Sequence, residues 1–128
     1  PDGLGKTAEP ILDHFEKFDA QGFEKVAFNA CEAPSVTTKL DEFPDKIYLC
    51  GMETHICVLL TAQHLVSRGH DVHVPFDAVV SRRKSYKDNG LSLLEDAGAT
   101  ITNTETLVFN TMGDSKYENF EKYSELIQ

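Results

Sequence analysis

The segment YLCGMETHICVLLTAQHLVSRG, residues 48–69, passes from an apolar run into a helical pattern and places Cys57 near the junction. The run KIYLCG (46–51) is nearly continuous in apolar residues, as expected of a strand covered on both faces in a parallel sheet. Over 54–68 apolar residues recur at helical spacing, and Gly69 suits the position just after a helix. The segment therefore predicts a strand, a short turn and a helix, with Cys57 in the first helical turn.

The flanking segments continue this alternation of strands and helices. We expect helices over 6–18 and 86–98, strands over 23–30, 70–76 and 99–102, and two short helices within 104–128, separated at MGDS. Alternation at this pitch predicts right-handed βαβ units, and hence an α/β fold with a parallel sheet. In such a fold Cys50 is expected to be inert core, and Cys31 to lie in a loop beside Lys25.

Length and composition limit the classes of protein that the chain can represent. A chain of 128 residues with 41% hydrophobic residues is enough for one domain or part of one. Its formal charge of −9 repels a phosphate backbone, so no nucleic-acid partner is expected. No apolar run approaches the roughly 20 residues that span a bilayer, so no membrane association is expected. Three cysteines form neither a disulfide framework nor a zinc pattern, which favours an intracellular protein of the cytoplasm or mitochondrion.

The position of Cys57 favours reactivity. Ligands of open α/β sheets bind beyond the carboxyl ends of the strands, where Cys57 is expected. In the first turn of a helix, unpaired N–H groups and the positive end of the helix dipole favour a thiolate, and the same groups would hold an oxyanion. The alternative is a small buried cysteine that packs a helix against a sheet. The residues by themselves leave both interpretations open.

A family resemblance bears on this choice. The stretch YLCGMETHICVLLTAQHLVSRGHDVHVPFDAVVSR, with GLSLLEDAGATI after it, resembles the signature of the isochorismatase-like cysteine hydrolases. The opening GLGKTAEPI and the late MGDSKYENFEKYSELI are similar to the isochorismatase-domain-containing branch. The specific part is the segment 51–58, and the similarity covers nearly the whole of 1–128. It implies a single Rossmann-like domain of three layers, α/β/α, with a parallel sheet.

The resemblance also implies a catalytic site. It makes Cys57 the nucleophile and Lys25 the second member of an Asp-Lys-Cys triad. It implies a cis peptide bond between Met52 and Glu53, with the N–H groups of Glu53 and Cys57 forming an oxyanion hole. The expected reaction is hydrolysis of a small-molecule amide, imide or ureido bond through a covalent intermediate on the cysteine, without a cofactor.

The catalytic aspartate of the family lies on a first strand upstream of Pro1, so no aspartate of this chain takes that role by motif. We therefore expect 1–128 to be the later part of a domain that lacks its N-terminal strand or strands here. Asp77 ends the next strand and is a candidate for lining the pocket, although accepting hydrogen bonds from loop N–H groups is its more ordinary task.

Several other polar residues are candidates for roles at or near the site. His55 is expected at the mouth of the pocket, with Met52 beside it, and plain solvent exposure is the alternative for the histidine. His70 and His73 fall on opposite faces of a strand, so no metal site is expected. The basic cluster SRRKSYK (81–87) is typical of a solvated helix start, with contact to an anionic substrate as the alternative.

Two rival functions remain. The first is a catalytically silent scaffold or binding protein with the same fold, which the missing aspartate favours. The second is a ribonuclease, because some members of this branch carry that label, although the charge of −9 argues against it. A small-molecule substrate and a homo-oligomer are the expected partners.

Overall fold

The computed structural model describes residues 5–125 and residue 127, apart from the side chain of Glu16. The helices are α1 (Glu9–Lys17), α2 (Pro34–Thr37), α3 (Leu59–Ser67), α4 (Lys84–Asp96), α5 (Thr104–Met112) and α6 (Phe120–Glu125). The strands are β1 (Lys46–Tyr48), β2 (Gly51–Met52), β3 (Asp71–Pro75), β4 (Val79–Val80) and β5 (Thr100–Thr102). A π-helical turn, Thr54–Val58, leads directly into α3.

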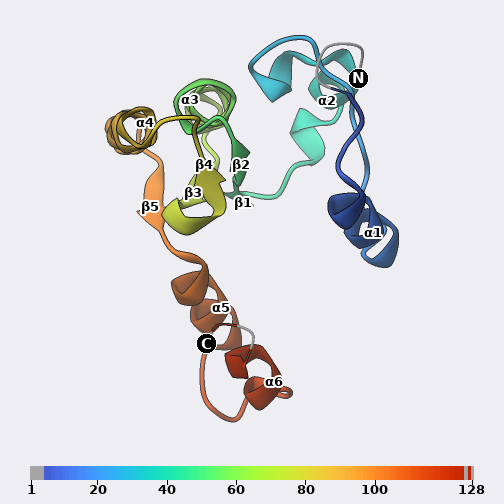
Figure 1. Cartoon of the computed structure of the whole chain (residues 1–128), viewed down its shortest axis with the longest axis vertical. Coiled ribbons are helices and arrows are strands. Elements are labelled where there is room, and N and C mark those ends of the chain that lie inside the picture. The colour runs from blue at the N-terminus through green and yellow to red at the C-terminus, as the bar shows by residue number, and fades with distance from the viewer. Residues whose placement is uncertain (1–4, 126, 128) are drawn as a thin grey trace.

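All strand pairs in the described residues are parallel. One sheet has the order β1-β3-β5, and β2 pairs with β4 just beyond it. Figure 1 shows α3 and α4 together on one side of these strands, with α1 and the α5–α6 segment extending away from them. This arrangement confirms the expected α/β fold with a parallel sheet.

The core lies between the strands and the pair α3 and α4. Val72 and Val74 of β3 are 1% and 0% exposed, and they meet Leu65 of α3 and Leu94 of α4, which are as deeply buried. Side chains alternate across a strand, so β3 sends Asp71 to the opposite face.

That opposite face of the sheet is only partly covered in the described residues. Lys46 and Tyr48 are exposed on β1, where the apolar run predicts burial on both faces. The prediction is wrong for this strand because α3 and α4 lie on the same face, and α5 continues past the end of the sheet (Figure 1).

The segment 23–30 is not a strand. It runs as loop and bends into a short 3-10 turn at Ala30–Glu32, and Val26 and Phe28 are exposed. Its backbone groups bond to side chains instead of to a neighbouring strand: the N–H of Ala30 donates to Thr61 Oγ1 at 2.9 Å. An apolar pattern specifies a strand only where another strand accepts the ladder, and no strand among the described residues pairs with this segment.

The predicted environments of Cys50 and Cys31 are both wrong. Cys31 is buried, at 2% exposure, in the 3-10 turn, whereas Cys50, between β1 and β2, is exposed. The break between the two short strands turns Cys50 outward, while the 3-10 turn directs Cys31 toward α2 and α3.

Helix α4 approaches the turn that carries Cys57 very closely. A Cβ atom added at Gly90, in the middle of α4, would lie 2.8 Å from the backbone nitrogen of His55 and 2.9 Å from its Cα. Both are backbone atoms, which cannot move aside as a flexible side chain can. Only glycine permits this approach, so Gly90 sets the distance between α4 and the reactive turn.

Replacing Gly90 with alanine tests that constraint. In an unconstrained helix this change stabilises by about 1 kcal/mol, but the backbone clash costs about 1–3 kcal/mol. We therefore expect Gly90→Ala to lower the free energy of unfolding in urea by about 1 kcal/mol. Ser92→Ala, at an exposed position of the same helix, serves as the control and should change it by less than about 0.5 kcal/mol. A Gly90→Ala protein as stable as the wild type would contradict the close approach.

Candidate active site

The turn between β2 and α3 is built from an unusual backbone. Gly51 has a φ of 107°, which L side chains rarely adopt, and the Met52–Glu53 peptide bond is cis. The carbonyl of Glu53 then accepts hydrogen bonds from the N–H groups of Ile56, at 3.0 Å, and Val58, at 3.2 Å. These bonds close the wide π-helical turn and place Cys57 within it, partly buried, just before α3.

Lys25 meets Cys57 from a segment far away in the sequence. Its Nζ lies 3.7 Å from Cys57 Sγ and also donates to the carbonyl oxygens of Ala27, at 3.0 Å, and Phe28, at 3.3 Å. The ammonium group is thus held over the sulfur by its own loop. The Lys25 ammonium group is therefore placed to interact directly with the sulfur atom of Cys57.

The loop that carries Lys25 is fastened to α3. Asn29 is 8% exposed, accepts the N–H of Cys31 at 3.0 Å through Oδ1, and has its Nδ2 3.2 Å from His64 Nδ1. With the bond from Ala30 to Thr61, these contacts tie the loop to two residues of α3. The helix that follows Cys57 therefore also fixes the position of Lys25.

On the other side of the turn, Glu53 pairs with Arg82. The Nε of Arg82 lies 3.0 Å and 3.2 Å from the two carboxylate oxygens, and the Glu53 side chain is only 17% exposed. His55 Nε2 is 3.5 Å from the same carboxylate, and its Nδ1 is 3.0 Å from Ser81 Oγ. With its ring centroid 5.0 Å from that of Tyr86, His55 is packed and hydrogen bonded, so the solvent-exposed alternative is wrong.

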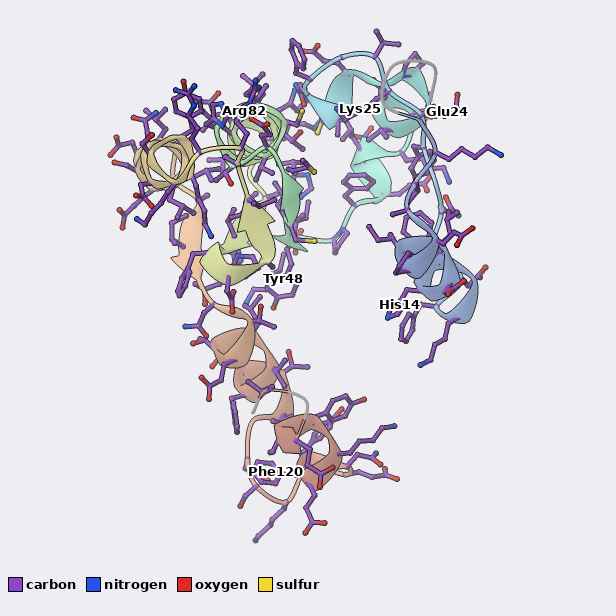
Figure 2. All side chains as sticks on the ribbon, in the orientation of Figure 1. His14, Glu24, Lys25, Tyr48, Arg82 and Phe120 are labelled. Atoms are coloured by element: carbon purple, nitrogen blue, oxygen red, sulfur yellow. The ribbon has the colours of Figure 1, made fainter. Side chains whose placement is uncertain are left out.

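A hollow of about 570 Å³ lies between α3 and the Lys25 loop, and neither Cys57 nor Lys25 is among the residues that line it. Leu60 and His64, three and seven residues beyond Cys57, line one side of it, and Ala27 and Phe28 of the Lys25 loop line the other. Met52 lies outside this lining and is 66% exposed. Figure 2 shows Lys25 and Arg82 at the same end of the molecule, the end at which α3 lies.

Asp77 serves the packing of α5. Its carboxylate accepts the N–H of Thr104 at 2.9 and 3.1 Å and the Thr104 hydroxyl at 3.0 Å, at the first residue of that helix. Burial raises the pKa of Asp77, but the hydrogen bonds from Thr104, assisted by Lys87, lower the pKa by more, so that it lies below its ordinary value. The structure thus gives Asp77 the hydrogen-bonding task and places it in a separate hollow with Phe76 and Thr104.

The remaining polar candidates lie apart from Cys57. His73 Nε2 lies 3.0 Å from Asp71 Oδ1 on the same strand, and His70 Nδ1 is 3.0 Å from the carbonyl oxygen of Pro44. In the part of the chain that the structure describes, no three His, Cys, Asp or Glu side chains converge on a common point suited to a metal ion. Burial raises the pKa of the Cys31 thiol, which opposes reactivity there.

Comparison with known proteins identifies the family. The family model of the isochorismatase domain matches residues 2–106. The chain belongs to the isochorismatase family. Isochorismatase domain-containing protein 2 of Bos taurus is 35% identical over 100% of this chain and 61% of its own length. The secreted isochorismatase effector Isc1 of Phytophthora sojae is 35% identical over 98% of this chain and 61% of its own length. The chain thus spans about three fifths of these relatives.

Solved structures show the same isochorismatase fold. The MAR1 ribonuclease of Caenorhabditis elegans superposes with a TM-score of 0.85 at 32% identity, over 99% of this chain and 65% of that one. The pyrazinamidase/nicotinamidase of Streptococcus mutans gives a TM-score of 0.62 at 28% identity, over 70% of this chain and 52% of that one. None of the described helices has the length and apolarity needed to cross a bilayer.

Sequence reasoning did not find every residue around Cys57. It overlooked the pairing of Glu53 with Arg82, although glutamate in the turn and arginine after the next strand were both visible. It also overlooked Asn29 and His64, which fix the Lys25 loop. A polar residue three or four positions after the lysine would have been the signal for a docked loop.

The contribution of Asp77 to the stability of the folded protein should depend on pH. Because its folded-state pKa lies below the ordinary value of 3.8, its contribution to stability is present above that value and is lost as the pH falls through the folded pKa. We expect Asp77→Asn to lower stability by about 0.5 kcal/mol at pH 7, since the cap is exposed. The deficit relative to wild type should shrink below pH of about 4 in thermal unfolding scans. Asp96→Asn, at an exposed carboxylate of α4, is the control and should show no such trend.

Proposed function

We propose that the protein is an isochorismatase-family hydrolase that cleaves a small-molecule amide or related bond through a covalent intermediate on Cys57. The observation that carries this proposal is the contact of 3.7 Å between Lys25 Nζ and Cys57 Sγ in the turn that begins α3. A positioned ammonium group and the N-terminal end of a helix both favour the thiolate, which is the nucleophilic form.

The proposed reaction has two steps. The Cys57 thiolate attacks the substrate carbonyl carbon, the C–N bond breaks, and the amine leaves with a proton, which gives a thioester. Water then attacks the thioester, so that the carboxylic acid is released and the thiolate is restored. The family resemblance assigns the proton transfers to an aspartate on a strand that precedes Pro1, in accordance with general acid–base catalysis.

The oxyanion of each tetrahedral intermediate needs hydrogen-bond donors. Within the described residues, the N–H of Glu53 donates to no other group, although its carbonyl accepts two bonds. The N–H of Cys57 lies in the first turn of the helical segment, where N–H groups lack partners in preceding turns. We propose that these two N–H groups form the oxyanion hole, with the adjoining hollow between α3 and the Lys25 loop receiving the rest of the substrate.

Alkylation by iodoacetamide tests the activation of Cys57. In the full-length protein, Cys57 should react fastest of the cysteines present in this chain, even at pH 7, as measured by peptide mass spectrometry. Replacing Lys25 with glutamine should slow the reaction about fivefold, because removal of a nearby partly solvated charge costs about 1 kcal/mol. Lys84→Gln, which removes an equal charge from an ion pair with Asp88, should leave the rate unchanged.

An inert Cys57 would overturn the hydrolase proposal and favour the rival interpretation, a silent scaffold of the same fold. If the Lys25→Gln protein reacts as fast as wild type, Cys57 remains the proposed nucleophile, but Lys25 has no part in its activation.

A ribonuclease is the second candidate, and the observation favouring it is the name of the C. elegans structure, which is 32% identical to this chain. The net charge of −9 opposes binding to RNA. We expect highly purified full-length protein to leave a single-stranded RNA intact in the presence and absence of Mg²⁺, judged by gel electrophoresis. RNA cleavage that copurifies with wild type and disappears in Cys57→Ser would reverse this choice.

A further inference from the structure

Glu53 is held in place through its side chain as well as through its backbone. Its backbone N–H is one of the two proposed oxyanion donors, and its side chain is held separately. The side chain is only 17% exposed, which is unusual for a carboxylate beside a turn at the surface. A carboxylate with so little water needs charged partners to offset its desolvation.

Arg82 and His55 are the partners of the Glu53 carboxylate, and Arg82 belongs to the segment that follows the neighbouring strand, β4. Arg82 places its Nε 3.0 Å from Oε1 and 3.2 Å from Oε2 of Glu53. From the near side His55 Nε2 lies 3.5 Å away, while its Nδ1 is anchored 3.0 Å from Ser81 Oγ. The segment 81–82 therefore contacts the turn at two points. Ser81 lies against His55, and Arg82 pairs with Glu53.

The pairing of β2 with β4 restricts the movement of the two segments that make these contacts. Met52, the residue before Glu53, pairs with Val80, which immediately precedes Ser81. The peptide that carries the Glu53 N–H is consequently fixed by a strand pair through Met52 and by an ion pair through the Glu53 side chain. Rotation of that peptide would require the Arg82 contact to break.

We propose that Arg82 is a positioning residue, which acts through the Glu53 carboxylate to hold the Glu53 N–H in the direction needed to bind the oxyanion. This inference rests on the proposed cysteine hydrolase function. Arg82 itself touches no reacting atom; it limits the rotation of the donor peptide. It should therefore affect acyl transfer, which forms an oxyanion, and leave alkylation of the same sulfur, which forms none, unchanged.

The experiment compares these two reactions in full-length protein. Acylation of Cys57 by 4-nitrophenyl acetate is followed by the release of nitrophenolate, and alkylation by iodoacetamide is followed by peptide mass. In Arg82→Gln we expect acylation to slow by about 10- to 100-fold and alkylation to stay within about twofold of wild type. Arg82→Lys should recover part of the loss, since an ammonium group can still pair with the carboxylate.

Arg83 provides the matched control. It is the adjacent arginine, and its guanidinium carbon lies 5.3 Å from the Tyr86 ring centroid, without a contact to Glu53 among the described residues. Arg83→Gln should leave both reactions unchanged. Equal effects of Arg82→Gln and Arg83→Gln would overturn the proposal, because the loss would then come from the charge of the segment as a whole.

Four further outcomes distinguish the role of Arg82 from its alternatives. Equal slowing of acylation and alkylation in Arg82→Gln would show that the whole turn has shifted, which contradicts a specific role at the donor. A loss confined to an anionic ester, 4-nitrophenyl hydrogen succinate, would make Arg82 a substrate-recognition residue instead. If Cys57 of the wild type is alkylated but not acylated, the proposed oxyanion hole is wrong, and the role of Arg82 with it. If Cys57 is unreactive toward both reagents, the hydrolase proposal itself is wrong.

Discussion

The close approach of α4 to the turn before α3 is the contact on which the arrangement around Cys57 depends. At Gly90 the helix lies against the backbone of His55, with less space than a methyl group requires. This contact sets where Tyr86 packs on His55 and where the loop before α4 can deliver Arg82 to Glu53. The absence of a side chain at Gly90 of α4 thus determines the environment of the turn that carries Cys57.

The site itself is assembled from three segments held by different forces. The turn of Cys57 is closed by backbone hydrogen bonds to the Glu53 carbonyl, which are local. The loop of Lys25 is held by polar side chains, with Asn29 beside His64 and the N–H of Ala30 donating to Thr61. An ion pair attaches the segment after β4. Hydrogen-bonded loops are suited to this task because they tolerate the irregular backbone that brings a lysine to a sulfur atom.

Much of the fold could be predicted because hydrophobic periodicity acts locally. The helices before and after β3, and β3 itself, lie close to the predicted ranges, since their apolar residues face one continuous core. The segment 23–30 was predicted wrongly because a strand needs a partner, and periodicity says nothing about partners. Cys31 and Cys50 were misplaced for a related reason, since the direction of a side chain at a strand break or in a 3-10 turn depends on the exact backbone.

By itself the sequence determined the family, the parallel α/β class and the position of Cys57 after a strand, since these follow from a contiguous motif and from local spacing. It named Lys25 only through resemblance. The tertiary structure alone decided that Lys25 Nζ reaches the sulfur at 3.7 Å, that Arg82 pairs with Glu53, and that Asp77 serves α5. Those contacts join residues 27 to 32 positions apart, and a distance between such residues is set by packing, which no local pattern encodes.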